Sequence, residues 1–97
     1  MNEPASPEIQ QLARGIAEDL AGPDAVKEFE VVETLDIHDR PAYLLSLLIE
    51  SQDAWQRIGK IRIELRMQLG DALAARGDPH RLLLQTLDRR DWSRLHA

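Results

Sequence analysis

The sequence predicts a single α+β domain spanning residues 1–97, with elements in the order α-β-β-α-β-α and an antiparallel hairpin whose helices pack on one face. Apolar residues recur at helical spacing in residues 7–21 and 53–76, which predicts two amphipathic helices. Apolar residues alternate in residues 28–37 and then form a nearly unbroken run, "AYLLSLLI", at residues 42–49. The turn-forming segment "DIHDRP" separates these two stretches, which indicates a hairpin.

The first helix has clear signals at both ends. Ser6 is a plausible N-cap and Pro7 suits the first helical position, where the missing N–H costs nothing. Gly22 and Pro23 then form a stop signal. The preceding segment, residues 1–6, is expected to be disordered.

Side-chain parity predicts the register of the hairpin. An odd-numbered loop around residues 38–40 pairs odd positions of one strand with odd positions of the other, whereas a shift by one residue scatters the apolar side chains over both faces. The predicted apolar face consists of Phe29, Val31, Leu35, Ile37, Tyr43, Leu45, Leu47 and Ile49. No glycine is present in the loop to supply the usual left-handed position.

The opposite face of the hairpin carries a second apolar strip, formed by Val32, Ala42, Leu44 and Leu48. A strand with one solvated face should alternate apolar and polar residues. The sheet is therefore expected either to be covered on both faces by its own chain or to present a surface to a partner.

The second helix, residues 53–76, is predicted to begin at Ser51 or Asp53 and to stop at Gly77. Its main apolar face contains Trp55, Ile58, Ile61, Leu65, Leu69, Ala72 and Leu73. A second stripe contains Gly59, Ile63, Met67, Gly70 and Ala74. Glycine inside a helix costs about 1 kcal/mol relative to alanine, so the glycines suggest close approach by another element, either a partner or the first helix.

The C-terminal segment allows two interpretations. Residues 82–87 are expected to form a third strand, parallel to the second, although a helical conformation remains an alternative. Asp88 then caps a short helical turn, from which Trp92 and Leu95 are expected to pack back on the core.

The charge of −5 is unevenly distributed. Residues 1–53 contain twelve acidic and three basic residues, a net −9, whereas residues 54–97 contain five acidic and nine basic residues, a net +4. There is no cysteine, so disulfides and thiolate sites are excluded. No basic, apolar leader and no stretch of ~20 apolar residues is present, and a cytoplasmic, non-membrane location is expected.

No residue pattern points to catalysis, a metal or a cofactor. Asp36, His38 and Asp39 lie together in the hairpin loop, but their spacing fits no zinc or calcium motif. Glu33 falls on the predicted apolar face, where it either reaches water at the sheet edge or pairs with an arginine such as Arg62. The sequence therefore predicts that the protein is not an enzyme.

Nucleic-acid binding is one alternative function, because basic side chains and an aromatic ring could contact phosphates and a base. The candidate residues are Arg57, Lys60, Arg62, Arg66, Arg89, Arg90 and Trp92. The acidic first half of the chain and the division of the basic side chains between different helix faces weigh against this function.

The favoured interpretation is a non-enzymatic protein-interaction or regulatory module that acts as a homodimer, because more apolar surface is predicted than one small core can bury. The suspected interface residues are Val32, Leu44, Leu48, Gly59, Ile63, Met67 and Gly70. An acidic inhibitor or antitoxin-like protein that binds a basic protein partner is a further alternative.

Overall fold

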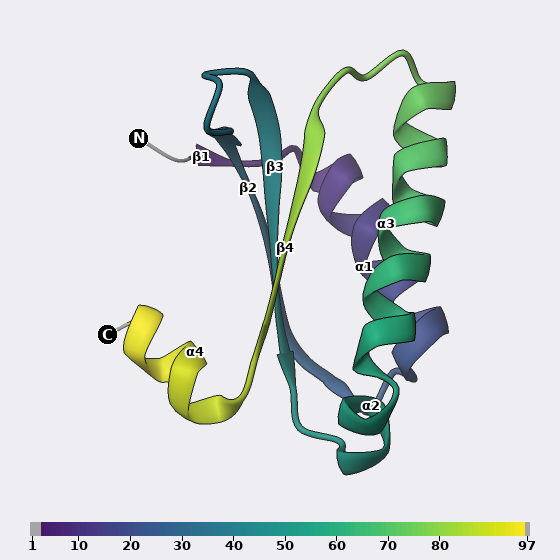
Figure 1. Cartoon of the computed structure of the whole chain (residues 1–97), viewed down its shortest axis with the longest axis vertical. Coiled ribbons are helices and arrows are strands. Elements are labelled where there is room, and N and C mark those ends of the chain that lie inside the picture. Colours follow the sequence, from purple (N-terminus) through teal and green to yellow (C-terminus); the bar gives the residue numbers. More distant parts are fainter. Residues whose placement is uncertain (1–2, 97) are drawn as a thin grey trace.

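The computed structural model describes residues 3–96 and confirms the α+β prediction (Figure 1). The elements are, in chain order, β1 (Glu3–Pro4), α1 (Pro7–Ala21), β2 (Val26–Leu35), β3 (Pro41–Ile49), α2 (Gln52–Gln56), α3 (Ile58–Ala75), β4 (Arg81–Leu87) and α4 (Arg89–Leu95). The sheet order is β1-β2-β3-β4, and only the β3–β4 pair is parallel. The strand alternative for residues 82–87 is therefore confirmed.

The β2–β3 hairpin has the predicted odd register. Leu35 pairs with Pro41 across a five-residue loop, and Val31 pairs with Leu45. Asp39 adopts a φ of 58°, so an aspartate takes the left-handed position that glycine usually occupies in such loops. The loop closes because the N–H of Asp36 donates to the carbonyl of Arg40 at 2.9 Å.

The N-terminal segment is more ordered than predicted. Met1 and Asn2 lie outside the described residues, but Glu3 and Pro4 pair with β2, and the N–H of Ala5 donates to the Val31 carbonyl at 3.0 Å. Next along this edge, the Gln10 side chain donates to the Val31 carbonyl at 2.7 Å and accepts from the Val31 N–H at 3.0 Å. The prediction of disorder was wrong for residues 3–6, because their backbone extends the sheet.

The long second helix predicted by the sequence is divided in two. Ser51 is the N-cap of α2, with its hydroxyl accepting from the Ala54 N–H at 3.1 Å. The backbone then leaves helical geometry at Arg57 (φ −105°, ψ 11°), and α3 begins at Ile58. At the far end, Gly77 has a φ of 72° and the Asp78 N–H donates to the Leu73 carbonyl at 2.9 Å, which terminates α3 in the expected way.

The core lies between the sheet and the α1–α3 layer. Its largest fully buried side chains on this side are Val31, Leu45, Leu47, Ile49, Leu65, Leu69 and Leu73. The helices α1, α2 and α3 lie on one side of the sheet, as predicted, whereas α4 lies on the other side (Figure 1). Asp88 caps α4, but Leu95 is exposed instead of packing on the core, so that part of the prediction was wrong.

Candidate interaction surface

The second face of β3 is covered unevenly. Figure 1 shows α4 beside the lower part of the sheet, on the side opposite α1 and α3. Leu48 is fully buried within the chain, and Ala42 and Ser46 are also buried. The suspected role of Leu48 in an interface is therefore wrong, because its own chain encloses it.

Above α4, three apolar residues on adjacent strands form a row across this face. Val32 pairs with Leu44, and Leu44 pairs with Leu83, which places one apolar side chain on each of three adjacent strands. Val32 and Leu44 are half-buried, and Leu83 is 37% exposed. This row presents a narrow apolar surface. The next row on the same face contains Thr34, Ala42 and Arg81, so polar side chains border the apolar surface on that side.

The outer face of α3 is the more exposed apolar surface. Ile63 and Met67 are 62% and 58% exposed, although they lie one helical turn apart in an element whose other side is fully buried. Ile63 lies two positions from buried Ile61 and Leu65, and Met67 lies two positions from buried Leu65 and Leu69. Two positions along a helix correspond to a rotation of ~200° around its axis. Their side chains therefore point directly away from the core.

The two suspected glycines have different surroundings. A Cβ atom at Gly59 would meet no atom within 4 Å, whereas one at Gly70 would lie 4.0 Å from the Leu82 side chain. Helix α1 approaches neither residue closely, so the prediction of close approach within the chain was wrong for Gly59. Gly70 faces β4 and does not belong to the exposed outer face.

Two charged residues flank this outer face. Lys60 and Asp71 are both exposed and are eleven positions apart, a rotation of ~20° around the helix. They lie on the same side of α3 as Met67, with the positive charge toward the N-terminal end and the negative charge toward the C-terminal end. We call Lys60, Ile63, Met67 and Asp71 the α3 outer face.

Two arginines that the sequence suggested for nucleic-acid binding contact β4 instead. The Arg66 guanidinium donates to the Leu82 carbonyl at 2.9 Å. Arg62 donates to the Thr86 hydroxyl at 3.0 Å and to the Leu84 carbonyl at 3.4 Å. Since β4 is the edge strand, these arginines occupy carbonyl groups that would otherwise face solvent.

The other candidate nucleic-acid residues are dispersed. Arg57 pairs with Asp53 at 3.0 Å on α2, and Arg89 pairs with Glu50 at 2.6 Å. Trp92 stacks on the His96 ring, with centroids 4.2 Å apart. Lys60 and Arg90 are exposed, on α3 and α4. The structure thus brings these residues to no common surface.

A polar cluster joins β2, β3 and the segment before β4. The Tyr43 hydroxyl donates to Asp78 at 2.7 Å, and the Tyr43 ring stacks on the His80 ring at 4.0 Å. His80 contacts Asp78 through Nδ1 at 2.5 Å and Glu33 through Nε2 at 3.0 Å. Glu33 therefore pairs with His80 and not with Arg62, which contacts Thr86 and Leu84 of β4 instead.

The pKa values in this cluster follow from its contacts. Burial raises the pKa of Tyr43, and its hydrogen bond to the Asp78 carboxylate raises it further. Burial alone would raise the pKa of Asp78, but hydrogen bonds from the His80 N–H, the Tyr43 hydroxyl and the His80 ring outweigh this effect and lower it. Asp78 is therefore held as a carboxylate that accepts hydrogen bonds.

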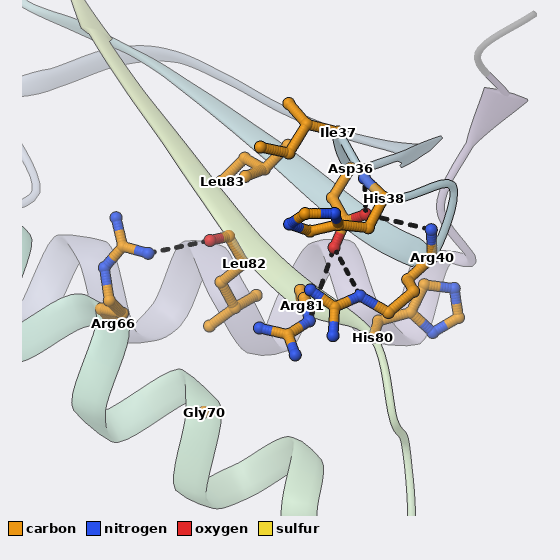
Figure 2. A pocket seen from close by; sticks show the side chains of 10 residues that line it. All are labelled: Asp36, Ile37, His38, Arg40, Arg66, Gly70, His80, Arg81, Leu82 and Leu83. Atoms are coloured by element: carbon orange, nitrogen blue, oxygen red, sulfur yellow. Dashed lines mark hydrogen bonds and ion pairs between the residues drawn. The ribbon is translucent and has the colours of Figure 1, made fainter.

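A depression of about 500 Å³ lies between the hairpin loop and the start of β4 (Figure 2). We call it the hairpin depression; its lining residues are Asp36, Ile37, His38, Arg40, Arg66, Gly70, His80, Arg81, Leu82 and Leu83. Asp36 accepts from the backbone N–H groups of Arg40 and His38, and these bonds, with the Arg40 side chain, lower its pKa. The turn sequence "DIHDRP" predicted the hairpin loop, but it did not predict that Arg66 and Arg81, from α3 and β4, would line the depression beside that loop.

Among residues 3–96 there is no group of three or more metal-ligating side chains that could hold a metal ion. The His38 loop is accounted for by turn hydrogen bonds to Asp36. Within the same described range, no helix is long and apolar enough to cross a membrane.

Sequence reasoning missed the polar cluster and the hairpin depression, because each joins residues that are far apart in the chain. The sequence offers one signal for the cluster: Glu33 stands on the predicted apolar face, so it needs a polar partner, and Asp78 and His80 lie just before the predicted third strand. Comparison with protein-family models, with curated proteins and with solved structures finds no match to this chain.

Proposed function

We propose that this chain is a non-enzymatic interaction module that acts as a homodimer through the α3 outer face. The observation that carries the proposal is the exposure of Ile63 and Met67, 62% and 58%, on the side of α3 opposite the core. Fully burying an exposed side chain of this size contributes about 1.5–3 kcal/mol, and Ile63 and Met67 can still gain more than half of this.

The charges beside this apolar pair favour a second copy of the chain as the partner. In an antiparallel pairing of two α3 helices about a two-fold axis, Lys60 of each copy approaches Asp71 of the other, whereas a parallel pairing places like charges together. The Lys60–Asp71 contact occurs twice, as a two-fold interface requires, whereas Glu64, four residues after Lys60, places a carboxylate near the axis in each copy and contributes to the expected weakness. Because one helix face buries less than the ~800 Å² per partner of a standard interface, we expect a weak, concentration-dependent dimer.

The polar cluster supports the non-enzymatic part of the proposal. Each of its groups contacts another member of the cluster, and Tyr43 is buried. These contacts give the cluster a role in holding the α3–β4 connection against the sheet, which requires no catalysis.

Sedimentation velocity from about 1 to about 100 μM tests the dimer, since weak interfaces dissociate in this range. The wild type should shift from monomer to dimer with concentration, and the Ile63→Glu/Met67→Glu variant should stay monomeric. Both side chains are exposed, so circular dichroism should show an unchanged fold. A wild type that stays monomeric at about 100 μM would contradict the proposal.

Charge exchange tests the antiparallel geometry separately. Lys60→Asp should weaken the dimer because two acidic groups then face each other across the interface, and Lys60→Asp/Asp71→Lys should restore it. Leu44→Glu is the matched control for the apolar row on the sheet. If Leu44→Glu abolishes the dimer while Ile63→Glu/Met67→Glu does not, the interface lies on the sheet and not on α3.

A further inference from the structure

The hairpin depression contains an unusual concentration of positive charge for this chain. Three arginines, Arg40, Arg66 and Arg81, line it together with one carboxylate, Asp36, in a protein whose net charge is −5. Figure 2 shows the Arg40 and Arg81 side chains converging on Asp36, with Arg66 on the far side of Leu82.

The hydrogen-bond acceptors at this site are already occupied. The Asp36 carboxylate accepts from the N–H groups of His38 and Arg40 at 2.8 and 3.0 Å, and from Nε of Arg40 at 3.2 Å. Nε of Arg81 is a further 3.4 Å from the same carboxylate. The Leu82 carbonyl accepts from Arg66.

The donors, in contrast, remain largely available. A guanidinium has five N–H donors, and the contacts above use Nε of Arg40, Nε of Arg81 and one terminal nitrogen of Arg66. The Arg40 and Arg81 side chains are about half exposed, 48% and 55%, so their remaining donors can reach a ligand. A site with spare donors, spare positive charge and occupied acceptors is complementary to an oxyanion.

Apolar side chains border the same space. Ile37 is 93% exposed at the tip of the hairpin, and Leu83 is 37% exposed on the adjacent part of β4. Both side chains line the depression (Figure 2). An apolar group attached to the oxyanion can therefore be covered while the anionic end contacts the arginines.

From these contacts we propose that the hairpin depression binds an organic oxyanion, a carboxylate or phosphate group carried on an apolar body. The anionic group contacts the free donors of Arg40 and Arg81, and the apolar body packs on Ile37 and Leu83. The site lies beside β4, away from the α3 outer face, so the proposal is independent of the homodimer.

Nuclear magnetic resonance titration with phenyl phosphate and with phenylpropionate tests this inference. Saturable shifts should appear at the backbone amides of residues 36–40 and 81–83, and the tighter of the two probes identifies the preferred oxyanion. Inorganic phosphate should bind more weakly than phenyl phosphate; equal affinity would remove the apolar contact from the proposal. Absence of saturable shifts with both organic probes would overturn it.

Arg81→Gln should weaken phenyl phosphate binding by about tenfold or more, because a charge-assisted contact is lost. The matched control is Arg14→Gln, which removes the same charge from an exposed pair with Glu18 on α1 and should leave the affinity unchanged. Equal affinity of the two variants would contradict the assigned site. Running the titration on Ile63→Glu/Met67→Glu separates this result from any effect of dimerisation.

Discussion

Tyr43 connects three parts of the fold through the two ends of its side chain. Its ring lies 4.0 Å from the His80 ring at an interplanar angle of 8°, and its hydroxyl donates to Asp78. His80 in turn contacts Glu33 on β2. One aromatic residue on β3 thereby holds the end of the α3–β4 connection against the hairpin, and the connection fixes where β4 enters the sheet.

Replacing Tyr43 with phenylalanine removes the hydroxyl while retaining the ring, and should lower the free energy of unfolding by about 1–2 kcal/mol at neutral pH. The folded-state pKa of Asp78 lies below its ordinary value of 3.8, so this carboxylate stabilises the fold above pH 3.8. The stabilisation is lost as pH falls through the lower folded pKa. The difference between wild type and Tyr43→Phe should therefore shrink in acid.

Urea unfolding at neutral pH and at about pH 2 measures this difference. In an Asp78→Asn background, Tyr43→Phe should have a smaller effect than in the wild type, because its charged partner is absent. An equal loss of stability at both pH values would contradict the assigned role of the carboxylate.

At the scale of elements, glycines have opposite effects at the end and in the middle of α1. Gly22 adopts a φ of 96° directly after the helix, a conformation that L side chains rarely adopt, and its N–H donates to the Glu18 carbonyl. Gly15 lies inside the helix and is exposed, and no side chain and no other part of the chain lies within 4 Å of the place where a Cβ would be. Only the first glycine is required by the backbone.

Gly15→Ala should therefore raise the free energy of unfolding by about 0.5–1 kcal/mol, because alanine restricts the unfolded chain and contacts nothing in the folded one. Gly22→Ala is the matched control and should lower it by about 1–2 kcal/mol through backbone strain. Thermal unfolding of the two variants checks both signs. Destabilisation by Gly15→Ala would mean that an unrecognised contact covers this face of α1.

For the molecule as a whole, the sequence correctly predicted the features of the fold that depend on the local periodicity of apolar residues. Parity alone predicted the register in which Val31 pairs with Leu45, and the handedness of crossovers predicted that a strand at residues 82–87 runs parallel to β3. Contacts made by long side chains were not predictable. The spacing of Arg62 and Arg66 along the helix fits a nucleic-acid surface and contact with β4 equally well. The spacing does not show that β4 lies beside α3, where both arginines contact it.

Both edges of the sheet are covered by other groups of the chain, and Arg62 and Arg66 cover one of them. At one edge, β1 and the Gln10 amide pair with β2. At the other, Arg62 and Arg66 bind carbonyl groups of β4. Unpaired edge strands associate with one another, and charged groups placed on them oppose this association.

The Arg62→Gln/Arg66→Gln variant should thus expose the Leu82 and Leu84 carbonyls and aggregate faster than the wild type on warming, with a loss of about 1 kcal/mol in folding stability for each arginine. Light scattering during a thermal ramp measures the aggregation. Arg14→Gln/Arg57→Gln removes two positive charges from helical ion pairs and serves as the control, since it leaves the β4 edge intact. If both double variants aggregate at the same rate, the effect comes from net charge and the arginines do not protect the edge.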